Sequence, residues 1–209
     1  TNDADNKVYL VNLGYEVGTA TPTTGSVAVA GNPRGWRKIR ILRAGDDYVL
    51  QYANLEDTSH QEIIISKNTD FNFNHFSFNT NNLVNVEPRK EKWDIGFTVL
   101  TNILPGAGSY GFSDFVIHNR KGGAVSYQVD TSDVLYDDFT ESNVVEANFS
   151  QDQTIIGSNW RDVFSGTART DRFYIIKDPN GNIYKLKFLA LTNQNGERGY
   201  PEFEYQLVQ

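Results

Sequence analysis

Cysteine and methionine are both absent from the 209-residue sequence, and histidine occurs only three times. Without cysteine, the chain forms no disulfide bond, holds no iron–sulfur cluster and uses no cysteine nucleophile. Without methionine, it does not begin at an initiator residue, so we expect that a targeting sequence was removed from the mature protein. No run of about eighteen apolar residues is present, and no membrane-spanning helix is predicted.

Acidic residues outnumber basic ones by 26 to 19, which gives a formal net charge of −7. Nucleic-acid binding needs a basic surface that pairs with phosphate groups, so the charge argues against nucleic acid as a partner. Aromatic residues make up 13% of the chain, and strand-forming residues are interspersed with Asn, Thr and Gly. This composition is typical of a β protein with long loops, and the length suits one domain.

Short runs in which apolar and polar residues alternate recur along the chain, separated by Gly, Pro, Asn and Asp, which favour turns. Because the connections are too short for parallel crossovers, we predict an all-β fold, an antiparallel β-sandwich or meander with long loops. At most one or two short helices are expected, the clearest from Ser132 to Glu141. The predicted strands are Lys7–Leu13, Arg37–Ala44, Tyr48–Leu55, Glu62–Lys67, Phe71–Phe78, Leu83–Glu87, Trp93–Thr101, Phe112–His118 and three within Asp171–Val208.

The domain organisation is predicted to be simple. Residues 1–6 are polar and are expected to form a flexible tether, and residues 7–209 to form a single all-β domain. Residues 7–67 are expected to be an N-terminal extension of the same domain. A Thr-, Gly- and Pro-rich stretch from Gly18 to Gly35 predicts a long loop or a weak hairpin within it.

The C-terminal segment Asp171–Val208 has the clearest local pattern. The turn Asp178-Pro179-Asn180-Gly181-Asn182 combines the fixed φ of proline with a glycine that accepts positive φ, as a tight hairpin needs. After this turn, Leu186, Phe188 and Ala190 recur at every second position and predict the buried face of a strand. We therefore interpret the segment as a three-stranded meander that forms scaffold and does not reach a ligand.

Several strings occur in an order that resembles a known family. They are Phe76-Ser77-Phe78, Val84-Asn85-Val86, Trp93-Asp94-Ile95-Gly96-Phe97, Gly122-Gly123-Ala124-Val125 and Arg172-Phe173-Tyr174-Ile175-Ile176 followed by the Gly-Asn turn. With the C-terminal meander, they resemble the HmuY family of Bacteroidetes haem-binding outer-membrane lipoproteins. The resemblance extends from about Phe76 to the C-terminus.

The resemblance implies an exported, non-enzymatic ligand carrier, located in the periplasm, outside the cell or at the outer membrane. It implies a membrane connection only through a lipid anchor on a cysteine that preceded Thr1, and transfer of haem to an outer-membrane receptor. The family's first axial histidine falls at Thr98 in this chain, and threonine is not a haem ligand. The region of the second, residues 126–158, contains no histidine.

Haem or another planar, hydrophobic ligand is therefore expected in a pocket between the Trp93-Asp94 strand and the loops near His118. His118 is the candidate iron ligand, and Tyr136 is a candidate to oppose it. The simpler interpretation of His118 is a strand-end histidine bonded to a nearby oxygen. Three further candidates are Tyr110, as a cap over the pocket, and Arg120 and Lys121, which could pair with the propionates or another anionic group.

Other features favour simpler interpretations. His60 is expected to be solvated, His75 to lie on the polar face of a strand, and the basic cluster Arg34–Arg43 to be a solvated strand face. No recognisable nucleophile–base–acid motif is present, so the chain is predicted not to be an enzyme. The alternative function is an adhesion or receptor-partner module of the same fold that does not bind haem, which predicts an exposed apolar patch.

Overall fold

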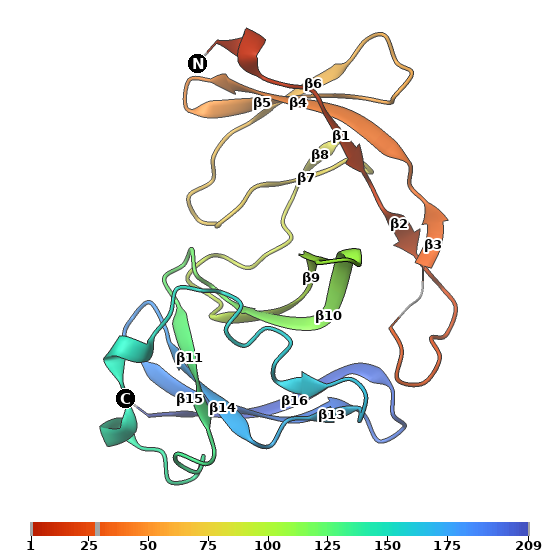
Figure 1. Ribbon diagram of the computed structural model, residues 1–209. Coiled ribbons are helices and arrows are strands. Elements are labelled where there is room, and N and C mark those ends of the chain that lie inside the picture. The colour runs from red at the N-terminus through yellow and green to blue at the C-terminus, as the bar shows by residue number, and fades with distance from the viewer. Residues whose placement is uncertain (1, 28–29, 209) are drawn as a thin grey trace. The chain divides into compact units, whose positions relative to one another are not determined.

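A computed structural model describes residues 2–27 and 30–208, which divide into two compact units (Figure 1). The first unit contains residues 2–21 and 30–88, and the second contains residues 22–27 and 89–208. About 47% of the chain is strand and 4% is helix, and every paired sheet is antiparallel. The predicted all-β fold is confirmed. That residues 7–209 form a single domain stays a prediction.

The first unit is built on a four-stranded sheet with the order β1-β4-β5-β6. Strand alternation buries Leu50 and Tyr52 on one face, and the Tyr52 ring contacts the rings of Phe76 and Phe78 at 5.2 and 5.4 Å. The elements are η1 (Asp3–Asp5), β1 (Tyr9–Asn12), β2 (Tyr15–Val17), β3 (Ala30–Pro33), β4 (Trp36–Ala44), β5 (Asp47–Ala53), β6 (Gln61–Ile65), β7 (His75–Ser77) and β8 (Asn82–Val84). The 3-10 turn η1 lies inside the segment predicted to be a tether.

Only part of the predicted strand Phe71–Phe78 forms, as β7. The preceding residues are held by hydrogen bonds that involve side chains and not by a strand ladder. The Phe73 amide donates to Glu87 Oε1 at 2.7 Å, and Asn74 Nδ2 donates to the Ser66 carbonyl at 3.1 Å. Such side-chain bonds give the backbone an alternative to a strand ladder.

The second unit is built on a four-stranded sheet with the order β11-β14-β15-β16, and the β9–β10 hairpin lies beside it (Figure 1). The predicted C-terminal meander is therefore observed as β14, β15 and β16. The elements are β9 (Ile95–Leu104), β10 (Gly108–His118), β11 (Val125–Asp130), η2 (Glu141–Asn143), η3 (Glu146–Asn148), β12 (Arg161–Asp162), β13 (Thr167–Ala168), β14 (Arg172–Lys177), β15 (Ile183–Thr192) and β16 (Arg198–Leu207).

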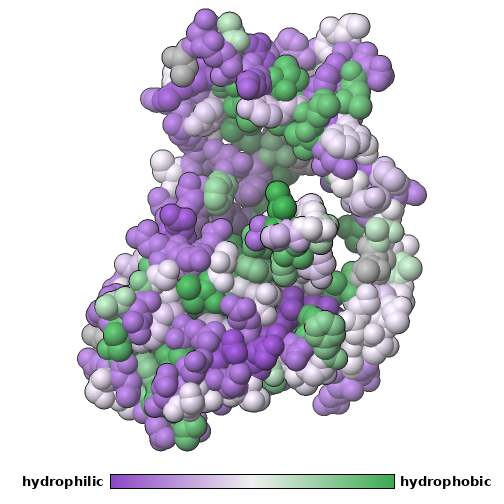
Figure 2. Space-filling model, viewed as in Figure 1, coloured by the Kyte–Doolittle hydropathy of each residue, from purple (hydrophilic) through white to green (hydrophobic). Residues whose placement is uncertain are grey.

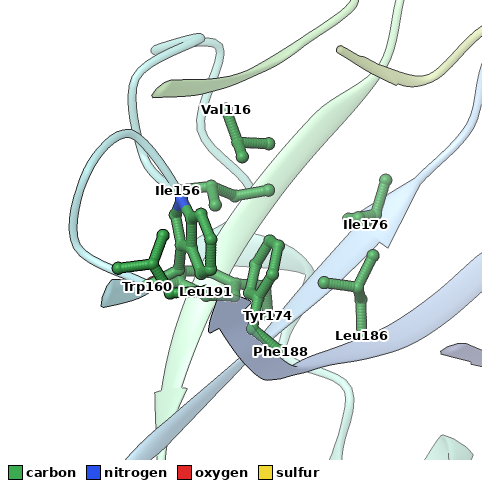
Figure 3. Packing of buried hydrophobic residues seen from close by; sticks show 8 residues of the cluster. All are labelled: Val116, Ile156, Trp160, Tyr174, Ile176, Leu186, Phe188 and Leu191. Atoms are coloured by element: carbon green, nitrogen blue, oxygen red, sulfur yellow. The ribbon is translucent and has the colours of Figure 1, made fainter. Parts of the chain in front are cut away.

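This C-terminal sheet has a separate apolar cluster on each face. Directly opposite residues share a face, so Tyr174 and Leu186 lie on one side and Ile175 and Lys185 on the other. The first face packs in a cluster of Val116, Ile156, Trp160, Tyr174, Ile176, Leu186, Phe188 and Leu191, and we call it the tryptophan face. In Figure 3, Ile176 and Leu186 stand at the end of this cluster away from Trp160. The second face packs in a cluster of Tyr127, Tyr136, Phe139, Phe173, Ile175 and Ile183, and we call it the tyrosine face.

The tyrosine face is covered by the loop 131–149, which corrects one prediction. No regular helix forms from Ser132 to Glu141; the segment consists of turns followed by η2. The reason is a buried lysine, because Lys185 Nζ donates to the carbonyls of Tyr136 and Phe139 at 2.7 and 3.0 Å. The Tyr136 carbonyl also accepts the Phe139 amide at 3.3 Å, three residues along the chain, where a helix would use the amide four residues along.

The β9–β10 hairpin carries a bulge between Phe112 and Phe115, where Asp114 takes a positive φ of 51°. Asp114 is held there by Arg198 of β16, which binds its carboxylate and also donates to Ser113 Oγ at 2.9 Å. Beyond the bulge, the hairpin exposes apolar side chains, with Val99 66% and Ile103 76% accessible. Figure 2 shows green, hydrophobic atoms among the purple ones in the region of this hairpin.

Candidate functional site

His118 is the last residue of β10 and is almost fully buried. Its Nδ1 lies 2.9 Å from Ser126 Oγ, while Nε2 is buried without a hydrogen-bond partner. Burial lowers the pKa of His118, and although Asp152 acts in the opposite direction, Arg120 adds to the lowering. The side chain is therefore a neutral imidazole, held at one nitrogen and unpaired at the other.

Tyr136 is buried in the aromatic cluster of the tyrosine face. Its ring contacts the Phe173 ring edge-on at 5.5 Å, and its hydroxyl donates to the Lys185 carbonyl at 3.4 Å. Burial raises the pKa of Tyr136 to about 12, with Glu204 and Asp137 adding to the effect. The phenol is therefore neutral, and its environment is that of a core residue.

The structure does not bring Thr98, His118 and Tyr136 together. The hydrogen bond to Ser126 places His118 on the tryptophan face, whereas Tyr127, the next residue, belongs with Tyr136 to the tyrosine face. The sheet itself separates His118 from Tyr136. Thr98 is paired with Phe115 and points away from the hairpin face that carries Ile95 and His118, because side chains alternate along β9.

The remaining predicted site residues are accessible to solvent. Tyr110 is 52% exposed and shares a hairpin face with Thr98, and its ring contacts Phe112 at 4.8 Å. Arg120 and Lys121 are exposed in the turn that follows β10. None of the three lines the cavity described below.

The turn after β10 is organised by Asn119, which is buried. Its Nδ2 donates to the carbonyls of Lys90 and Trp93 at 2.7 and 2.8 Å, and its Oδ1 accepts from the Gly122 amide at 2.9 Å. A Cβ on Gly122 would lie 2.3 Å from that Nδ2, so only glycine fits. Gly122 therefore leaves room for the Asn119 side chain, which holds the segment that ends at Trp93 in place.

A cavity of about 430 Å³ lies at the end of the tryptophan face, a size typical of small-molecule sites. It is adjacent to His118, since Ile95 is the cross-strand partner of His118 and Ile176 that of Ser126. The lining is mostly aromatic and aliphatic and consists of Lys92, Trp93, Asp94, Ile95, Ile176, Tyr184, Leu186, Phe203 and Tyr205.

Aromatic rings form a continuous series along this cavity. Phe203 contacts Phe97 at 6.2 Å and Tyr205 at 6.4 Å, and Tyr205 contacts Tyr184 at 6.2 Å. Tyr205 is 66% exposed, so its ring and hydroxyl are available at the cavity mouth. Offset and edge-on rings at such distances provide a wall suited to a flat, apolar ligand.

One carboxyl group, that of Asp94, stands among these apolar walls. Burial raises the pKa of Asp94, and the charge of Asp178 raises it further. The environment therefore disfavours the ionised form, and it disfavours placing a second negative group beside Asp94.

The other polar features of the sequence have local partners. Arg40 donates to the Asn6 carbonyl at 3.2 Å, Lys38 to the Asp57 carbonyl at 2.8 Å and Arg43 to the Gly45 carbonyl at 3.0 Å. The basic cluster thus serves mainly to tie the first unit together. His60 is exposed, with Nε2 3.8 Å from Glu62.

The cavity lies beside Trp93 and Asp94, where the pocket was predicted, and that a ligand binds there stays a prediction. The C-terminal meander was interpreted as scaffold alone, yet Tyr184, Phe203 and Tyr205 line the cavity. Their alternation with polar residues showed which face they share. It did not show which part of that face stays open, because the cover comes from segments distant in the sequence.

Comparison with known proteins shows that the part of the chain that forms this cavity matches a protein family. The family model described as HmuY protein matches residues 51–205, which is about three quarters of the chain. The chain belongs to the HmuY family. The match contains every residue that lines the cavity. The chain matches no curated protein and no solved structure.

HmuY is a haem-binding carrier family whose members are extracellular or surface-associated. Within residues 2–27 and 30–208, no helix is long and apolar enough to cross a membrane. Nor do the described residues contain a group of three or more His, Cys, Asp or Glu side chains that could hold a metal ion. Among the cavity residues, Tyr184 and Tyr205 are the side chains of a type that ligates haem iron.

Proposed function

We propose that this HmuY-family protein is a non-enzymatic carrier that binds haem or another planar, largely apolar ligand in the cavity at the end of the tryptophan face. The observation that supports the proposal is the cavity itself, with aromatic walls from Trp93, Phe203 and Tyr205 in the part of the chain that matches the family. Burial of a flat apolar ligand against such rings is favourable.

Ligation of haem iron by two histidines does not fit this chain. Thr98 stands at the family's first axial position. Ligation by His118 and Tyr136 together does not fit either, because the two side chains lie on opposite faces of the sheet. We infer that affinity comes from the apolar walls and that Tyr184 or Tyr205 supplies any protein ligand to the iron. Lys92 is the cation at the cavity that could pair with a carboxylate of the ligand.

A titration with haemin tests this proposal. We expect a shifted Soret band and quenching of tryptophan fluorescence, since Trp93 lines the cavity. Tyr205→Ala should weaken haemin binding about tenfold, because one aromatic contact of about 1 kcal/mol and its buried area are lost. Iron-free protoporphyrin should bind with similar affinity if the walls dominate.

The matched control is Tyr110→Ala. Tyr110 is also an exposed tyrosine whose ring contacts a phenylalanine, here edge-on, but it lies outside the cavity. It should leave haemin binding unchanged. A Soret shift that survives Tyr205→Ala and disappears in Tyr110→Ala would contradict the proposed location.

We also propose the family's location and partners for this chain, namely attachment to the outer surface through a lipid anchor and transfer of the ligand to an outer-membrane receptor. Family membership supports these statements. Protease treatment of intact cells that express the full gene should digest the protein if it is exposed at the surface.

The adhesion or receptor-partner function is the second candidate, and one observation favours it. Phe164, in the turn between β12 and β13, is fully exposed, and Val163 beside it is 45% exposed. A failure of haemin and protoporphyrin to bind would favour this function over the carrier.

A further inference from the structure

The first unit contains a second cavity that takes no part in the site described above. Its volume is about 430 Å³, and it lies between the loop 66–74 and the β7–β8 hairpin. This size is again within the range of small-molecule sites. All of its lining residues belong to the first unit, so it is separate from the cavity on the tryptophan face.

The strand alternation of β7 accounts for the position of the cavity. Phe76 packs against Tyr52, so the preceding residue, His75, points away from the sheet core and lines the cavity. Two hydrogen bonds fix the opposite wall: the Phe73 amide donates to Glu87 Oε1, and Asn74 Nδ2 donates to the Ser66 carbonyl. These bonds hold the cavity in shape before any ligand arrives.

The polar lining consists mainly of uncharged groups that both donate and accept hydrogen bonds, contributed by Ser66, Asn68, Thr69, Asn74 and Asn85. The formal charges of the two charged lining residues, Lys67 and Glu87, sum to zero. His75 adds part of an imidazole ring to the lining, while its Nε2 is buried without a hydrogen-bond partner.

The apolar lining includes aromatic rings, among them Phe73. This ring is 55% exposed and contacts the His75 ring edge-on at 6.3 Å. A pyranose ring has the complementary chemistry, because it presents one face of C–H groups for an aromatic ring and a rim of hydroxyls for amides. We propose that this cavity binds a neutral saccharide, with Phe73 against the sugar face and Asn85 bonded to its hydroxyls.

Amide NMR spectra of the full chain, recorded with millimolar methyl glycosides of glucose, galactose, mannose and N-acetylglucosamine, test this proposal. At least one glycoside should shift the signals of residues 66–75 and 83–87. Phe73→Ala should weaken that binding about tenfold, a loss of about 1.4 kcal/mol, whereas Phe73→Tyr should preserve it. Asn85→Ala should weaken it less, since one neutral hydrogen bond is lost.

Phe164→Ala is the matched control, because it removes an exposed phenylalanine from the second unit. It should leave glycoside binding unchanged, and Phe73→Ala should leave haemin binding unchanged. The inference is overturned if no neutral glycoside shifts these signals, if only glucuronate does, or if Phe164→Ala weakens binding as much as Phe73→Ala. An unchanged amide spectrum away from residue 73 shows that Phe73→Ala remains folded.

Discussion

The two faces of the C-terminal sheet are covered to different extents. On the tyrosine face, the loop 131–149 packs Tyr136 and Phe139 over the strands, and the buried Lys185 bonds to their carbonyls. On the tryptophan face, Trp160 stacks on Phe188 at 4.4 Å at one end, while the other end is open as a cavity.

The two faces also differ in how their buried polar groups are bonded. Each buried polar group of the tyrosine-face cover has a partner, since Lys185 Nζ meets two carbonyls and the Tyr136 hydroxyl meets a third. Near the open end of the tryptophan face, by contrast, His118 Nε2 and Trp93 Nε1 are buried without partners. Of the two faces, the tryptophan face is the one with an open cavity and is therefore the one suited to a ligand.

The largest effect is expected from Trp160→Ala, at the closed end of the tryptophan face. Trp160 is fully buried, and its Nε1 donates to the Asp114 carbonyl at 2.9 Å. The substitution should lower the free energy of unfolding by about 3–5 kcal/mol. Urea denaturation measures this loss. Trp36→Ala, at a half-exposed position in the first unit, should cost far less.

Lys185→Met, on the tyrosine face, should have the next largest effect. It removes the Lys185 donor from two buried carbonyls and leaves the Tyr136 carbonyl with the Phe139 amide alone, so it should lower the free energy of unfolding by about 2–3 kcal/mol. Lys187→Met is the matched control, because Lys187 Nζ also lies over the Tyr136 ring, at 4.4 Å, but pairs with Glu204 at a partly exposed position. That change should cost less than about 1 kcal/mol. Equal losses would mean that the carbonyl bonds do not hold the loop.

A smaller, pH-dependent effect is expected from His118. Because burial lowers its pKa in the folded state, protonation favours the unfolded state. This contribution to stability is present above the ordinary value of 6.5 and is lost as the pH falls through 6.5 toward the lower folded value. Urea midpoints measured between about pH 8 and about pH 5 should fall, and His118→Gln should remove part of that fall. An identical pH dependence in the variant would count against a buried neutral imidazole.

The smallest effect is expected from Asp94→Asn at the cavity. The pKa of Asp94 is raised, so its ionised form is disfavoured in the folded state. Stability is therefore lost as the pH rises from the ordinary pKa of 3.8 through the higher pKa of the folded state. A neutral amide should therefore stabilise the protein slightly at neutral pH. Asp171→Asn should do the opposite, because its hydrogen bond with Arg172 lowers the pKa of Asp171. Thermal unfolding of both variants gives the two signs.

The sequence predicted β14, β15 and β16 because period-two alternation and the turn at Asp178–Asn182 are local signals, but β11 (Val125–Asp130) was not predicted. It failed where a distant residue intervenes. The predicted helix at Ser132–Glu141 is replaced by turns because Lys185, about fifty residues away, binds its carbonyls. The pairing of His118 with Tyr136 failed for a related reason, since the face that a loop covers depends on tertiary packing.

Binding of diamagnetic gallium protoporphyrin, followed by amide NMR of the full chain, tests most directly whether the open face is the ligand site. The account predicts the largest shifts at Ile176, Tyr184, Leu186, Phe203 and Tyr205, with little change at Tyr127, Phe139 and Phe173. Shifts concentrated at Tyr127, Tyr136, Phe139 and Phe173 would place the ligand under the loop 131–149 and would contradict it.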